Sequence, residues 1–130
     1  MNYKKVTTND VYNQVVVELG YFKFHRNCMA YKYLIDAIVL VYKNNAYIRN
    51  FSSSLYVDIA KKYGTKPENV SWSISKLLST MYMNTEEKVI KQYFKLFYYE
   101  KPSPKAFIIY VAEKVEQKLV SKQKKFSKIS

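Results

Sequence analysis

Residues 55–79, "LYVDIAKKYGTKPENVSWSISKLLS", predict two amphipathic helices joined by a short corner. Apolar residues recur at helical spacing on both sides of Gly64, which stands where a helix commonly ends in the left-handed conformation. Two helices separated only by Gly64, Thr65 and Lys66 have the spacing of a helix-turn-helix. The apolar residues are Leu55, Ile59, Ala60 and Tyr63 before the corner, and Val70, Ile74, Leu77, Leu78 and Met81 after it.

The corner also carries a predicted capping box in "TKPE". The Thr65 hydroxyl is placed to accept a hydrogen bond from the amide of Glu68. The Glu68 carboxylate is placed to accept one in return from the amide of Thr65. Pro67 fits the first turn of a helix, because an amide at that position would have no helical partner. We therefore expect the second helix to be capped by Thr65.

The rest of the chain predicts an all-α, compact six-helix domain in which helices 3 and 4 form the helix-turn-helix. Two glycines and three prolines leave few places for hairpins. Caps and periodicity place helices at about residues 11–19, 29–43, 54–63, 69–79, 85–97 and 104–119. We expect residues 1–119 to form one domain. Residues 120–130, rich in lysine and free of acid, are expected to be a flexible basic tail.

The formal net charge of +12 predicts a polyanionic partner, with nucleic acid the commonest. Of the 22 basic residues only Arg26 and Arg49 are arginines. Lysine acts as a point charge on phosphates, whereas bidentate recognition of guanine is mostly the work of arginine. The composition thus favours contact with the DNA backbone over reading of base sequence.

The chain lacks the parts of common catalytic and metal sites. His25 is the only histidine and Cys28 the only cysteine, and the two glycines lie far apart. These residues predict no metal cluster, no Ser-His or Cys-His pair and no phosphate-binding loop, hence no enzyme and no cofactor. The unpaired Cys28 suits a reducing cytoplasm. The longest apolar run, residues 37–42, is too short to span a membrane, so we expect a cytoplasmic protein without a membrane partner.

Three stretches together resemble one known family: "YKYLIDAI" (residues 31–38), "LYVDIAKKYGTKPENV" (residues 55–70) and "KPSPKAFIIYVAEKV" (residues 101–115). Their order and spacing are similar to the C-terminal DNA-binding effector domain of the stage-zero sporulation response regulator A of endospore-forming bacteria. The resemblance implies a six-helix domain that binds AT-containing promoter boxes, often as tandem copies, and contacts RNA polymerase. The family's domain follows a phosphoacceptor receiver domain, which this chain has no room for, so we expect a stand-alone effector.

The chain departs from the family where the family reads DNA. The resemblance places the family's glutamate, two arginines and histidine at Ser71, Trp72, Ser75 and Lys76, and a further arginine at Asn69. The family's target sequence is therefore not carried over. The link between the fifth and sixth helices is also shorter than the family's, which puts the polymerase contact in doubt.

Two interpretations of the fourth helix remain open. In the first, the protein is a bacterial transcriptional regulator and the helix reads AT-rich double-stranded DNA through Asn69, Ser71, Trp72, Ser75, Lys76 and Ser79. Phosphates would be bound by Lys61, Lys62, Lys66, His25, Arg26, Lys122, Lys124 and Lys125. In the second, the exposed face contacts a protein, and the chain is an interaction or dimerisation module that antagonises or assists a regulator.

Trp72 has a third, purely structural interpretation, in which it packs on a neighbouring helix against the aromatic residues 93–99. The expected partners beside DNA are RNA polymerase, a regulator protein, and a second copy of the chain on DNA. A plasmid or phage role fits the same residues as a chromosomal one.

Overall fold

A computed structural model describes the backbone of residues 5–96, 98 and 100–129, and the side chains of these residues up to 123. Within that part of the chain the regular structure is entirely helical. A 3-10 turn (Asn45–Arg49) and a π turn (Phe51–Leu55) link the second and third α-helices. The α-helices are α1 (Thr8–Leu19), α2 (Met29–Lys43), α3 (Tyr56–Tyr63), α4 (Pro67–Asn84), α5 (Glu87–Phe94) and α6 (Pro104–Ile129).

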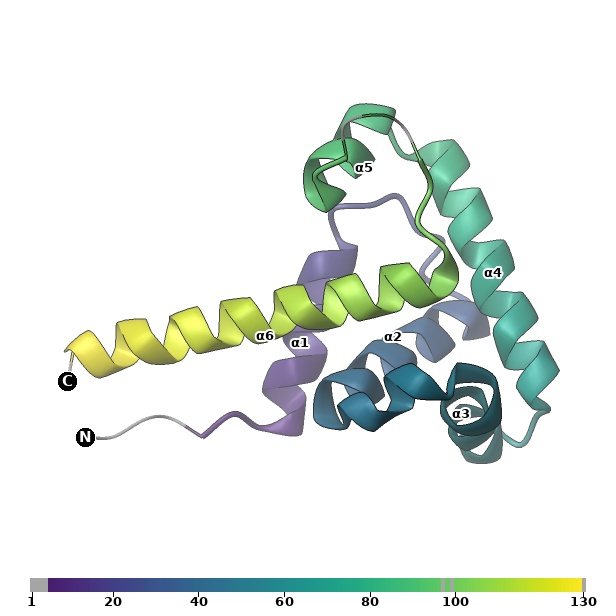
Figure 1. Cartoon of the computed structure of the whole chain (residues 1–130), viewed down its shortest axis with the longest axis horizontal. Helices are drawn as coiled ribbons and strands as arrows, with labels where there is room; N and C mark the ends of the chain where they lie inside the picture. The colour runs from purple at the N-terminus through teal and green to yellow at the C-terminus, as the bar shows by residue number, and fades with distance from the viewer. Residues whose placement is uncertain (1–4, 97, 99, 130) are drawn as a thin grey trace.

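The helix α2 lies at the centre of the core, and its apolar residues are buried on most sides. Leu34, Ala37 and Ile38 are all fully buried. The helix α6 runs along the longest axis of the molecule and crosses α1 and α2, with α3 and α4 at one end of this axis (Figure 1). This packing arises because α2 and α6 both carry apolar residues at helical spacing. The α6 side of the core consists of Phe107, Ile108, Val111, Ala112, Val115 and Leu119.

The amino ends of α1 and α6 are defined by side-chain caps. The Thr7 hydroxyl accepts from the amide of Asp10, and the Asp10 carboxylate accepts from the amide of Thr7. This capping box begins α1 at Thr8, three residues before the predicted start. The Ser103 hydroxyl accepts from the amide of Ala106, and α6 begins at Pro104 as predicted.

The predicted carboxyl ends of α4, α5 and α6 are wrong, and α4 continues to Asn84 rather than ending near residue 79. The helix α5 ends at Phe94 rather than near residue 97, because Lys95 adopts the left-handed conformation with φ 56°. The helix α6 continues to Ile129 rather than ending near residue 119, so residues 120–129, which belong to the expected flexible basic tail, have helical backbone. Their high lysine content is compatible with a helix, since lysine is a good helix former.

Among the described residues, no helix combines the length and the apolar composition needed to cross a lipid bilayer.

Candidate nucleic-acid interface

The helices α3 and α4 form the predicted helix-turn-helix. Gly64 follows α3 with φ 66° and ψ 38°, a left-handed conformation that costs a residue with a side chain more than glycine. The amide of Thr65 then donates to the carbonyl of Ala60 at 2.9 Å, which closes the end of α3. Pro67 starts α4 at its first helical position. The corner is therefore built by backbone geometry.

The predicted capping box at this corner is wrong. The N-cap of α4 is Lys66, and no side chain caps the helix. Thr65 is used differently: its hydroxyl accepts a hydrogen bond from the side-chain amide of Asn69 at 3.0 Å. The N-cap is Lys66, one residue after the predicted Thr65, so Thr65 contacts a residue of the outer face instead of the amide of Glu68.

The outer face of α4 presents the predicted base-reading residues on the side opposite the core. At about 100° per residue these positions lie on the side of α4 opposite the buried stripe that includes Val70 and Ile74. Ser71, at the edge of the face, is half-buried. The exposed members are Asn69, Trp72, Ser75, Lys76 and Ser79.

Trp72 is directed outward, with 63% of its surface exposed. The Lys76 ammonium lies 4.8 Å from the centre of the Trp72 ring, a distance typical of a cation–π contact. The interpretation of Trp72 as a ring packed against residues 93–99 is wrong for the described part of that segment. There Tyr93 and Phe94 pack instead on Phe22 and Tyr110.

A shallow groove of about 290 Å³ runs beside Trp72, between α4 and the loop that follows α1. His25 lines it from the loop, and Lys76 and Thr80 from α4. The loop is fastened to the far end of α4, because the Lys23 amide donates to the Thr85 hydroxyl at 2.9 Å. The sequence alone did not predict that Cys28, Ser73 and Thr80 join this groove, because the contact connects segments about 50 residues apart in the chain.

The three lysines near the corner differ in whether an acidic side chain pairs with them. Lys61 and Lys66 are exposed and form no ion pair with a described residue. The Lys62 ammonium lies 3.0 Å from the Asp36 carboxylate, which also accepts from the Tyr63 hydroxyl at 2.6 Å. The hydrogen bond that the Lys62 ammonium donates to Asp36 raises the pKa of Lys62. Asp36 thus partly neutralises one predicted phosphate contact, and its isolation within the apolar run "YLIDAIVL" was a signal for such a role.

Arg26 is exposed in the same loop as His25. Burial raises the pKa of Tyr31, and the nearby Arg26 opposes that rise. Arg26 therefore lies close to the amino-terminal part of α2. The loop thus holds two of the predicted phosphate contacts, of which His25 borders α4.

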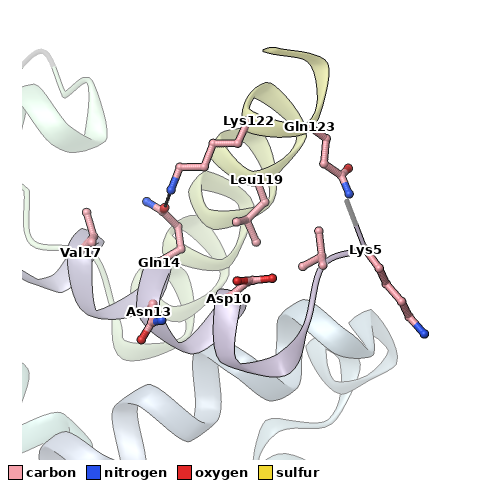
Figure 2. Close-up of a pocket in the computed structure, with 9 residues that line it drawn as sticks. Lys5, Asp10, Asn13, Gln14, Val17, Leu119, Lys122 and Gln123 are labelled. Carbon is pink, nitrogen blue, oxygen red and sulfur yellow. Dashed lines mark hydrogen bonds between the residues drawn. The ribbon is translucent and has the colours of Figure 1, made fainter. Parts of the chain in front are cut away.

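The predicted phosphate contact Lys122 lies away from α4. It contacts α1, and the carboxyl-terminal part of α6 runs toward the end of the long axis opposite α3 and α4 (Figure 1). Its ammonium donates to the Gln14 side-chain carbonyl at 2.8 Å, beside a groove between α1 and α6 of about 380 Å³ (Figure 2). The side chains of Lys124 and Lys125 lie outside the described residues.

Lys122 is the last of three α6 lysines at four-residue spacing, which we call the lysine ladder: Lys114, Lys118 and Lys122. The Lys118 ammonium lies 2.8 Å from the carboxylate of Glu18, which is fully buried. The Lys114 ammonium lies 5.8 Å from the centre of the Tyr93 ring and 5.7 Å from that of Tyr110. Each ladder lysine therefore has a partner within the fold.

Glu18 is the centre of this arrangement. It also accepts hydrogen bonds from the Tyr93 hydroxyl at 2.8 Å and from the Gln14 amide at 3.0 Å. Burial, followed by the hydrogen bond to Glu18, raises the pKa of Tyr93 far above its usual range. The hydrogen bond to Glu18 likewise raises the pKa of Lys118. Glu18 thus joins α1, α5 and α6, and its position seven residues after Val11 on the buried face of α1 was the sequence signal for burial.

Among the described residues, histidine, cysteine and acidic side chains do not gather in any group of three or more that could hold a metal ion.

Comparison with known proteins agrees with this architecture. The family model described as "Sporulation initiation factor Spo0A C terminal" matches residues 13–115, most of the chain. The chain belongs to this family. The family is one of DNA-binding transcription-factor domains and not of enzymes. The match confirms the predicted resemblance and the helix-turn-helix domain. No curated protein matches the chain.

Proposed function

We propose that the protein regulates transcription by placing the outer face of α4 in the major groove of duplex DNA. The observation that carries this proposal is the 63% exposure of Trp72 on the helix that follows the Gly64 corner. In a helix-turn-helix the amino-terminal part of the second helix contacts base edges. Trp72 is the sixth of the 18 residues of α4 and lies in this part, and Lys76 lies about one turn further along, near the middle of the helix.

The contacts of this face with DNA follow from the chemistry of its side chains. The Trp72 ring offers an apolar surface to thymine methyl groups, and Lys76 can donate to guanine or to a phosphate. The cation–π contact restrains both side chains before DNA arrives. Asn69, Ser71, Ser75 and Ser79 add short polar groups and no charge. We infer a modest preference for AT-rich duplexes, because thymine presents a methyl group in the major groove that an apolar ring can contact.

Affinity in this proposal comes mainly from phosphates. Lys61 and Lys66 border the corner, while His25 and Arg26 lie in the loop beside α4. Lys62 contributes less than the other two corner lysines, because Asp36 holds its ammonium. Lys122 has its own partner in Gln14 and is not part of this face. A contact with RNA polymerase remains a prediction.

A protein partner is the second candidate occupant of the α4 face. The groove beside Trp72 supports it, because an exposed aromatic ring next to a recess resembles the anchor of a protein interface. The net charge of +12 favours DNA over this candidate, since a polyanion gains more from such a surface.

The test is a titration with AT-rich and GC-rich duplexes at low and near-physiological salt. Trp72 fluorescence is followed together with the anisotropy of labelled DNA, and the signal is unambiguous because the chain has one tryptophan. We expect both signals to change, with tighter binding to AT-rich DNA. Binding without a fluorescence change would remove α4 from the interface. No binding at low salt would contradict DNA binding and favour the protein partner.

The double variant Trp72→Ala with Lys76→Ala sharpens this test. If both side chains contact bases, the variant should lose about tenfold in discrimination between sequences while its affinity for random DNA changes little. Met83→Ala is the matched control, since Met83 is 79% exposed at the far end of the same helix. An equal loss of affinity on all duplexes would argue against base reading by this pair.

A further inference from the structure

The hydrogen bond between Asn69 and Thr65 holds a polar side chain at the amino end of the outer face of α4. The Asn69 side-chain amide donates to the Thr65 hydroxyl at 3.0 Å. Asn69 is exposed and is the third residue of α4, whose amino end lies at the outer edge of the molecule (Figure 1). In a helix-turn-helix, side chains at the amino end of the second helix reach base edges. The hydrogen bond therefore lies where base contacts are expected.

Thr65 is a rigid acceptor for this hydrogen bond. It follows Gly64, whose left-handed conformation forms the corner, and its own amide donates to the Ala60 carbonyl at 2.9 Å. Its side chain is half-buried, and a β-branched side chain has few accessible rotamers. The backbone of Asn69 is held as well, because its amide donates to the Lys66 carbonyl at 3.0 Å. The corner thus fixes the backbone at both ends of the hydrogen bond.

The hydrogen bond leaves two groups of the Asn69 side chain unused. A primary amide has one carbonyl oxygen and two N–H groups, and Thr65 accepts from one N–H. No other described residue forms a hydrogen bond with the Asn69 side chain. One acceptor and one donor therefore remain. Among the four bases, only adenine presents both a donor and an acceptor in the major groove, at N6 and N7.

We propose that Asn69 reads one adenine through these two groups and that Thr65 is the positioning residue that orients its amide. The Asn69 carbonyl accepts from adenine N6, and the remaining N–H donates to N7. This assignment rests on the proposed function, because it requires α4 to lie in the major groove. It adds to that function a specific base and the residue that prepares its contact.

Selection of binding sites from a pool of random duplexes tests the adenine contact with the whole chain. The wild type should enrich adenine at one position, where any other base lowers the affinity about tenfold. Asn69→Ala should lose this preference and keep the preferences at the other positions of the site. Ser79→Ala is the matched control, because Ser79 is another exposed polar residue of the outer face, and it should keep the adenine preference.

A modified base tests the contact atom by atom. Replacement of the selected adenine by 7-deazaadenine removes the N7 acceptor and leaves N6 in place. We expect this replacement to lower the affinity of the wild type about threefold to tenfold, the effect of one hydrogen bond. The affinity of Asn69→Ala should not change. An equal loss in the wild type and in Asn69→Ala would assign the N7 contact to another residue and overturn the proposal.

Two variants of Thr65 separate positioning from stability. Thr65→Val keeps nearly the same shape without the hydroxyl, so we expect the adenine preference to fall about threefold. Thr65→Ser keeps the hydroxyl and should retain the preference. Anisotropy titrations with duplexes that differ only at the adenine position measure the ratio of affinities, and circular dichroism checks that each variant stays helical. With Thr65→Val, an equal loss on both duplexes, or no change, would overturn the positioning role.

The outcomes distinguish this proposal from the proposed function. A wild type that binds duplexes with a change in Trp72 fluorescence, but selects no adenine, would overturn the adenine contact and leave α4 in the groove. An adenine preference that Asn69→Ala retains would do the same. Failure to bind any duplex at low salt would overturn both.

Discussion

The outer face of α4 and the lysine ladder of α6 differ in a way that their sequences do not reveal. The α4 face has one lysine, Lys76, and the ladder has three at regular spacing. By charge alone the ladder is the better site for a polyanion. Yet Lys118 binds the buried carboxylate of Glu18 and Lys122 binds Gln14, whereas Trp72 and its neighbours on α4 face outward.

We infer that the lysines without a partner contribute more to DNA binding than the lysines paired within the fold. A lysine already paired with a carboxylate must give up that pair, or share it, to contact a phosphate. The exposed corner lysines Lys61 and Lys66 pay no such cost.

The largest effect is expected when the ladder loses its central lysine. Lys118→Met leaves the fully buried Glu18 carboxylate without a cation, so we expect the free energy of unfolding to fall by about 3 kcal/mol. Lys114→Met is the matched control on the same face. It removes only contacts with aromatic rings and should cost about 0.5–1 kcal/mol. Urea unfolding measures both, and equal losses would contradict the central role of Glu18.

The same network predicts a loss of stability at alkaline pH. The folded-state pKa values of Tyr93 and Lys118 are raised above their ordinary values of 10.0 and 10.5. A raised pKa in the folded state gives stability that is present below the ordinary value and is lost as the pH rises above it. We expect the free energy of unfolding to decline above pH 10, and Tyr93→Phe to decline less steeply. An identical slope in urea unfolding of the variant would exclude Tyr93 as a cause.

The third prediction concerns salt. Lys61→Ala with Lys66→Ala should weaken binding to every duplex and make the slope of log affinity against log salt less negative by about 1.8, or 0.9 for each lost phosphate contact. The control pair Lys114→Ala with Lys122→Ala removes the same charge from the ladder and should leave this slope unchanged. Fluorescence anisotropy at four salt concentrations measures both variants. A change of slope in the control pair would place the ladder on the DNA.

The smallest effect is expected at Asp36. Asp36→Asn keeps an acceptor for the Tyr63 hydroxyl but removes the charge that holds Lys62. We expect about a twofold to threefold gain in DNA affinity, because one more lysine becomes free for a phosphate. The gain should disappear when Lys62→Ala is added. A gain that persists in the double variant would assign the effect to the general loss of negative charge.

The sequence predicted the helices better than their ends. The apolar periods in α2, α4 and α6 are long and regular, and a helix is the structure that buries such a stripe. The capping box at Thr65 failed because the same residues can satisfy the corner with Lys66 as the N-cap and an Asn69–Thr65 hydrogen bond. The end of α6 was placed ten residues early, because the loss of apolar periodicity after Leu119 does not require the helix itself to stop.

The candidate site was predictable only in part. The outward direction of the α4 residues follows from their spacing opposite Val70 and Ile74. Asp36 stands out in the sequence as an isolated acid in an apolar run, but its pairing with Lys62 was not predictable, because the two residues lie 26 positions apart. The contact of Lys122 with Gln14 spans 108 positions, and no local pattern reports a partner at that distance.

The all-helical domain, the corner at Gly64, the outward face of α4 and the large positive charge could all be predicted from the sequence, because they depend on local spacing, backbone conformation and composition. Which lysines are paired and which are exposed depends on the packing of the helices. The charge of a side chain is a property of the residue, but its availability depends on what the fold places within about 3 Å of it. Lys62 and Lys118 each have a carboxylate within 3.0 Å, whereas Lys61 and Lys66 form no ion pair with a described residue.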